Sequence, residues 1–112
     1  MNKDEKTKGV VEKPFEATIN LHSTSELMVS NDYKERFIAE YVQTKVRYEK
    51  LKAMNNKYVA TIEGGKDYLG FKPSCSVELL LKQQRLMGEY LGCLEQRAVI
   101  EGIELPNPYI NF

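Results

Sequence analysis

The sequence has no tryptophan, a single histidine and two cysteines among its 112 residues. Because His22 is the single histidine, a Ser-His-Asp triad is a poor prediction for this sequence. No nucleophile stands beside a base in a recognisable motif. Cys75, Cys93 and His22 are widely spaced and fall short of the roughly four ligands that a structural zinc ion needs. We therefore expect no enzyme, no metal site and no cofactor.

Long hydrophobic runs are also missing. No segment approaches the roughly 20 apolar residues that cross a bilayer, so we expect no membrane span. The first nine residues, MNKDEKTKG, are polar and lack the apolar core of a secretory signal. We expect a cytosolic protein whose two thiols are reduced.

Net charge is zero, with 16 basic and 16 acidic residues, which argues against bulk binding to nucleic acid. The charges are nevertheless segregated. Residues 45–85 hold nine cations and four acids, a net charge of +5, whereas the remainder from residue 26 holds three cations and eight acids, a net charge of −5. This pattern fits an anion site at a basic pole or charge matching between subunits. It equally fits solvated helix faces with i,i+4 pairs such as Lys45 with Glu49.

The length suits one domain, which we divide into four segments. Residues 1–14 are polar and read as a mobile tail. Residues 15–30 form a strand and turn segment, because apolar and polar residues alternate over 15–22 and Ser23 with Glu26 resembles a capping box for a helical turn through Met28. Residues 31–105 form a helical hairpin, and residues 106–112 are a C-terminal extension.

The first long helix is predicted over residues 32–62. Asp32 and Glu35 have the spacing of an N-cap and an N3 residue. A stripe at alternating steps of four and three follows: Phe37, Tyr41, Thr44, Tyr48, Leu51, Asn55, Tyr58 and Ile62. The alternative is that Asn55-Asn56 ends the helix, and that residues 58–62 and 68–71 form a β-hairpin across Gly64-Gly65.

The second long helix is predicted over residues 76–103, capped by Ser74 or Ser76. Gly88 and Gly92 interrupt it, each at a cost of about 1 kcal/mol relative to alanine, so we expect another backbone to approach that face closely. The helix should end near Gly102, because two prolines follow at positions 106 and 108.

These elements predict a mainly α protein, an antiparallel two-helix hairpin with a possible short N-terminal strand. Both helices carry more apolar surface than one seam can bury. We therefore predict a homo-oligomer, the alternative being that residues 15–30 fold back over the hairpin.

Tyrosines lie beside cations in both helices. A guanidinium binds phosphate through paired donors, and a tyrosine ring stacks on a nucleobase, which suits a small anionic nucleotide. The tyrosines also suit a buried interface. The candidate ligand-binding residues are Lys45, Arg47, Tyr48, Arg85, Tyr90 and Arg97.

Three runs carry a resemblance to a known group of proteins. Tyr33-Lys34-x-x-Phe37 and Arg47-Tyr48-Glu49-Lys50-Leu51 in the first helix precede Leu79-Leu80-x-x-Gln83-x-x-x-Met87-x-x-Tyr90-x-x-x-Leu94-x-x-Arg97-Ala98 in the second. Over residues 31–105 the chain resembles small helical-hairpin proteins of bacteriophages, similar to the hairpin domain of phage sponges that act against CBASS and Thoeris immunity.

The resemblance implies an oligomer in the cytoplasm of an infected host that sequesters a cyclic nucleotide or cyclic ADP-ribose signal without cleaving it. The ligand-binding residues of the sponges do not align one by one with this sequence, so the resemblance assigns no ligand-binding residue here. Two other functions stay open: a protein–protein inhibitor of a host defence enzyme, for example an anti-CRISPR, and an oligomeric phage accessory protein with no ligand.

Overall fold

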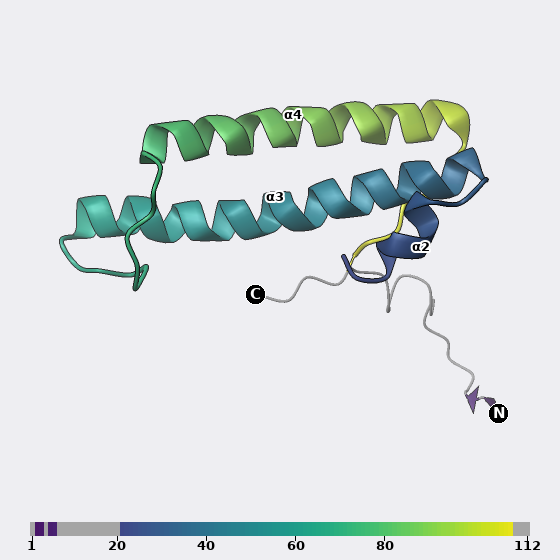
Figure 1. Ribbon diagram of the computed structural model, residues 1–112, viewed down its shortest axis with the longest axis horizontal. Helices are drawn as coiled ribbons and strands as arrows, with labels where there is room; N and C mark the ends of the chain where they lie inside the picture. The colour runs from purple at the N-terminus through teal and green to yellow at the C-terminus, as the bar shows by residue number, and fades with distance from the viewer. Residues whose placement is uncertain (1, 4, 7–20, 109–112) are drawn as a thin grey trace.

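The computed structural model describes residues 2–3, 5–6 and 21–108. Its two short strands, β1 (Asn2–Lys3) and β2 (Glu5–Lys6), pair with each other in parallel. Residues 21–108 contain the helices α2 (Thr24–Met28), α3 (Tyr33–Gly64) and α4 (Val77–Glu101). The two long helices lie side by side and antiparallel, with α2 against one end of α3 (Figure 1). The predicted helical hairpin is thus confirmed.

Helix α3 begins and ends where its flanking residues dictate. Asp32 is the N-cap, and its Oδ1 accepts a hydrogen bond from the Lys34 backbone N–H at 2.9 Å. Glu35 follows in the first turn, where a carboxylate favours the positive end of the helix dipole. Gly65 ends the helix in the left-handed conformation, with a φ of 70° that glycine adopts at little cost.

The alternative in which Asn55-Asn56 ends the first helix is wrong. Helix α3 runs unbroken through both residues, and Asn55 is only 1% exposed. Its Nδ2 donates to the Leu80 carbonyl at 3.1 Å and to Gln84 Oε1 at 2.9 Å. Asn55 therefore ties the two helices together, and residues 58–62 are helical.

Helix α4 is bounded by two conventional caps. Ser76 Oγ accepts from the Leu79 backbone N–H at 3.2 Å. At the other end Gly102 has a φ of 72°, and the Ile103 backbone N–H donates to the Ala98 carbonyl at 2.9 Å. The predicted bounds of both long helices are confirmed to within two residues.

The core lies at the open end of the hairpin, away from the loop that joins the helices. Its buried residues come from α3, α4 and the segment after α4: Phe37, Tyr41, Val42, Val46, Leu91, Leu94, Ala98 and Ile103. Leu21 and Leu27 pack against this cluster. The described part of segment 15–30 therefore folds back over the hairpin, which is the alternative that the sequence offered to a homo-oligomer. This cover reaches the open end only.

Thr24 anchors the folded-back segment. It is fully buried, and its Oγ1 donates to the Leu21 carbonyl at 2.7 Å and accepts from Gln43 Nε2 at 3.0 Å. The predicted helical turn is α2, with Ser23 at the N-cap, but the Ser23 side chain makes no capping hydrogen bond. The capping-box prediction is therefore wrong in that detail.

The predictions for the N-terminal segments fall mostly outside the described residues. Of the strand predicted over 15–22, the structure describes only Leu21 and His22, which form a turn. Of the tail predicted over 1–14, it describes only the residues of β1 and β2.

The two interior glycines of α4 lie in different surroundings. A Cβ on Gly88 would lie 3.2 Å from Cε1 of Tyr48, whereas a Cβ on Gly92 would meet no atom within 4 Å. The prediction of a close approach is correct at Gly88, but a tyrosine ring approaches there instead of a backbone. At Gly92 the prediction is wrong within this chain, because that position is open.

Over residues 21–108, neither α3 nor α4 combines the length and the apolar character that a membrane crossing needs.

Candidate functional site

The loop between α3 and α4 is held in place by side chains at both of its ends. Asp67 Oδ1 accepts from the backbone N–H groups of Leu69 and Gly70, at 3.0 and 3.1 Å. The Tyr68 backbone N–H donates to Thr61 Oγ1 at 2.9 Å, and so attaches the loop to the last turns of α3. These bonds fix a turn in which Gly70 has a φ of 81°.

The other end of the loop is attached to the same helix. The Tyr58 hydroxyl donates to the Cys75 carbonyl at 3.1 Å, one residue before the N-cap of α4. Tyr58 and Thr61 lie one turn apart on α3, so both loop attachments use one side of that helix. The loop therefore folds against α3, as the teal segment of Figure 1 shows.

A pocket of about 470 Å³ lies between this loop and α3, within the range of small-molecule sites. We call it the turn-end pocket. It is lined by Tyr58, Thr61, Asp67, Leu69, Gly70, Phe71, Lys72 and Pro73. Two aromatic rings, one ammonium group and one carboxylate thus border a single cavity.

The chemistry of this pocket suits an aromatic anion. Phe71 is 55% exposed, which leaves its ring available to stack on a planar ligand. Lys72 lines the pocket, and Lys66 stands over the Tyr68 ring at 5.6 Å from its centre. Asp67 Oδ1 is engaged by two backbone N–H groups, which offset its negative charge locally. The pocket lies at the basic pole that the charge pattern predicts.

A second, smaller cavity of about 280 Å³ lies between α2 and α3, and we call it the α2–α3 groove. It is lined by Met28, Arg36, Glu40, Gln43, Thr44 and Arg47. Arg36 Nη1 already donates to the Ser30 carbonyl at 2.7 Å. Among the six predicted ligand residues, only Arg47 lines this groove.

Lys45, Tyr48 and Arg85 have partners within the chain. Lys45 Nζ pairs with Glu49 Oε2 at 3.0 Å, and Arg85 Nη1 pairs with Glu89 Oε2 at 3.5 Å. The Tyr48 ring packs where Gly88 leaves room for it. Each of the three residues therefore has its own partner within the chain.

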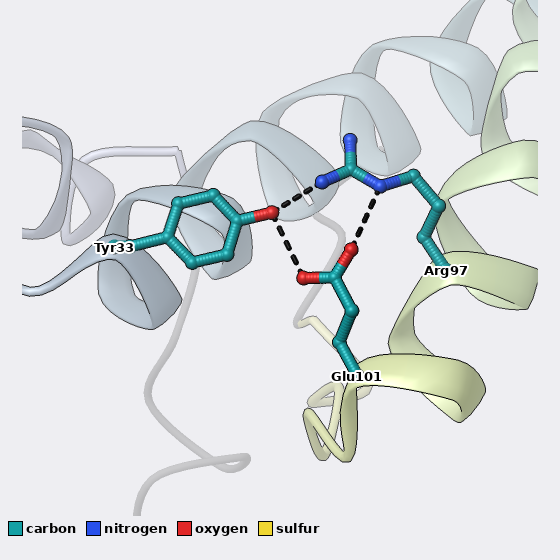
Figure 2. A network of polar contacts seen from close by, with 3 residues as sticks. All are labelled: Tyr33, Arg97 and Glu101. Carbon is teal, nitrogen blue, oxygen red and sulfur yellow. Dashed lines mark hydrogen bonds and ion pairs between the residues drawn. The ribbon is translucent and has the colours of Figure 1, made fainter.

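Arg97 belongs to a polar network at the open end of the hairpin (Figure 2). Its Nε donates to Glu101 Oε2 at 3.0 Å, and its Nη2 donates to the Tyr33 hydroxyl. The Tyr33 hydroxyl donates to Glu101 Oε1 at 2.9 Å. The guanidinium also lies over the Phe37 ring, 4.9 Å from its centre.

This network changes the acidity of its members. The hydrogen bond to the Glu101 carboxylate is the largest cause that raises the pKa of both Tyr33 and Arg97. The hydrogen bond from Tyr33 is likewise the largest cause that lowers the pKa of Glu101 below 4.5. Arg97 and Glu101 of α4 thus both hold the hydroxyl of Tyr33 on α3.

Tyr90, the last predicted ligand residue, lines an apolar groove on one side of α4. None of the six predicted residues lines the turn-end pocket. Sequence reasoning did not select Tyr58, Phe71 or Lys72. The available signal was the aromatic and basic segment 64–73, between glycines and a proline, which was interpreted as a connection or as part of a β-hairpin.

Over the part of the chain that the structure describes, no group of three or more His, Cys, Asp or Glu side chains is placed to hold a metal ion. Cys75 and Cys93 are both free and exposed.

Comparison with known proteins gives one family. The model of a family described as Sequestin matches residues 31–100, which is more than half of the chain and contains α3, the loop and nearly all of α4. This match agrees with the resemblance to phage sponge proteins that the sequence suggested. No curated protein and no solved structure matches the chain.

Proposed function

Because the chain belongs to the Sequestin family, we propose that it binds and sequesters a small anionic nucleotide, a cyclic nucleotide or cyclic ADP-ribose signal of host immunity, without cleaving it. The family name suggests the sequestration of a molecule. The chemical class of the ligand is our proposal.

The turn-end pocket is the observation that carries this choice of ligand. Exposed Phe71 offers a stacking surface for a base, Lys72 offers a cation for a phosphate, and the volume of about 470 Å³ admits a compact nucleotide. The surrounding excess of cations draws an anion toward this end of the hairpin.

We propose retention of the ligand without chemistry. The one carboxylate that lines the turn-end pocket, Asp67, uses Oδ1 to order the loop backbone. The pKa shifts of Tyr33, Tyr41, Arg97 and Glu101 belong to groups that do not line the pocket. A pocket that combines an exposed aromatic ring with an ammonium group supports binding.

The proposal keeps Lys45, Arg47, Tyr48, Arg85, Tyr90 and Arg97 as further candidate contacts, which several copies of the chain could unite. It also includes self-association and a phage origin, with action in the host cytoplasm. Among the six, Arg47 has the strongest support for a phosphate contact, because it shares the α2–α3 groove with Arg36.

A thermal-shift titration against cyclic dinucleotides, cyclic trinucleotides and cyclic ADP-ribose isomers tests the proposal. A ligand at a hundredfold excess over its Kd stabilises the folded state by about 2.7 kcal/mol, a shift of several degrees for a domain of this size. Folded protein that shifts with no member of the panel would contradict the proposal.

Matched variants then locate the site. Stacking on an aromatic side chain contributes about 1–3 kcal/mol per base, so Phe71→Ala should weaken binding by roughly tenfold to a hundredfold. Lys72→Gln should also weaken it, with increased loss at low salt. The controls are Val99→Ala and Lys34→Gln, which remove the same kinds of exposed group at the open end. Equal binding by pocket and control variants would exclude the turn-end pocket.

A further inference from the structure

One side of α4 exposes a continuous row of apolar residues. Leu79, Leu86 and Tyr90 are 53%, 49% and 44% exposed, and Cys93 is exposed as well. Their spacing of seven, four and three residues places them on one side of the helix. We call this row the α4 stripe.

The α4 stripe is also hollowed. A groove of about 320 Å³ runs along it, lined by Leu79, Lys82, Gln83, Leu86, Met87 and Tyr90. The folded-back residues that shield the open end pack against the core cluster around Phe37 and Val42, so they leave this groove uncovered. Exposed apolar patches with polar edges are typical of protein–protein contacts.

We propose that a second copy of this chain covers the α4 stripe, with the two α4 helices antiparallel about a two-fold axis near Gln84 and Arg85. The inference rests on the self-association included in the proposed function, and it names the face, the direction and the register. Two hairpins joined in this way form a four-helix bundle, which buries apolar surface that one hairpin cannot.

Charge along α4 favours the antiparallel direction. Residues 77–88 carry Glu78, Lys82 and Arg85, a net charge of +1, whereas residues 89–101 carry three acids and one arginine, a net charge of −2. Two antiparallel α4 helices place the basic half of each beside the acidic half of the other. Two parallel α4 helices would place the two acidic halves together and the two basic halves together. Lys82 and Glu89 are seven residues apart on the same edge of the stripe, so the two-fold brings Lys82 near Glu89 of the partner subunit.

The two cysteines give an independent marker of the register. Cys93 lies on the side of the stripe, and Cys75 lies two residues before the first residue of α4, at that end of the helix. Their midpoint is residue 84, and the midpoint of the groove from Leu79 to Tyr90 lies between residues 84 and 85. An antiparallel pair about this axis lays Cys75 beside Cys93 of the partner subunit.

A parallel pair makes a different prediction for the same thiols. It lays each cysteine beside its own equivalent, and it keeps the start of α4, next to Cys75, about 24 Å along the axis from Cys93 of the partner subunit. The two directions therefore differ in which thiols a short cross-linker can join.

Native mass spectrometry and a short bismaleimide decide between them on the full-length chain. We expect an even number of subunits, cross-linked dimers in the wild type, and loss of those dimers in both Cys75→Ser and Cys93→Ser. Cross-linking that survives in either single-cysteine variant would overturn the antiparallel register. A chain that is monomeric at high micromolar concentration would overturn this inference and the self-association, but not the ligand binding, which the titration above measures separately.

A matched pair of substitutions tests the face itself. Leu86→Glu places a charge at the centre of the stripe and should raise the dimer Kd at least tenfold. Leu81→Glu is the control, because Leu81 is 40% exposed but lies about 140° around the helix from Leu86. Equal dissociation by both variants, or a stoichiometric foreign protein on the stripe in place of a second copy, would overturn the inference. If Leu86→Glu loses its helical circular dichroism, the cysteine experiment still decides.

Discussion

The same substitution at the two interior glycines of α4 should have different effects on stability. In a helix interior, alanine is more favourable than glycine by about 0.8–1 kcal/mol, because glycine loses more backbone entropy on folding. At Gly92 the added Cβ meets no atom within 4 Å, so Gly92→Ala should gain nearly all of this free energy of unfolding. For a domain of about this size, that gain raises Tm by about 4 °C.

Gly88→Ala should gain little or nothing. Its Cβ would lie 3.2 Å from Tyr48 Cε1 and 3.4 Å from the hydroxyl oxygen, so the ring must move by a few tenths of an ångström. Moving a packed side chain off its preferred rotamer costs about 0.5–1.5 kcal/mol, which cancels the gain in helix propensity. The expected net change is therefore close to zero.

Thermal unfolding followed by circular dichroism at one fixed protein concentration compares the two variants, since Tm depends on concentration in a self-associating protein. Repeating Gly88→Ala in a Tyr48→Ala background isolates the contact, and the full helix-propensity gain should return there. Equal stabilisation by Gly88→Ala and Gly92→Ala in the wild-type background would refute the packing of Tyr48 against Gly88.

Three further predictions concern buried or paired polar groups. Asn55→Leu should lower the free energy of unfolding, measured with urea, by about 1–3 kcal/mol, because it leaves Gln84 Oε1 without its donor. Adding Gln84→Leu should recover most of this free energy, and no recovery would refute the pairing. Burial and a carboxylate partner raise the pKa of Tyr41, so the stability present below pH 10.0 should decline at higher pH, and Tyr41→Phe should flatten that decline in thermal melts. The pKa of Glu101 is lowered from 4.5 chiefly by Tyr33, so its stabilisation should be lost as pH falls below 4.5, and a Glu101→Gln variant with unchanged acid sensitivity would contradict this.

Local sequence signals predicted the ends of the long helices well. Asp32 and Ser76 are short polar N-caps, and Gly102 accepts a left-handed conformation after the last turn of α4. Such signals act within a few residues of the chain, so they can be read without knowing the tertiary structure. The ambiguous signal was Asn55, because asparagine often ends a helix, and only the contact with α4 shows why it is retained inside one.

The candidate site depended on contacts that periodicity does not reveal. Lys45 and Arg97 lie at helical spacing from Tyr41 and Tyr90 in the sequence, but in the fold they pair with Glu49 and Glu101. The turn-end pocket exists because Asp67 turns the loop back on itself and Thr61 holds it against α3. Such loop geometry is set by individual hydrogen bonds, so a pattern of apolar residues gives no warning of it.

Sequestration without cleavage leads to a simple mass measurement. The folded chain is incubated with each ligand that shifts its Tm, a native mass spectrum is recorded, and the ligand is then released by denaturation and weighed. We expect a complex of protein and nucleotide, and a released ligand of unchanged mass after prolonged incubation. A folded chain that forms no complex, or a released ligand that has been hydrolysed, would contradict the proposed function.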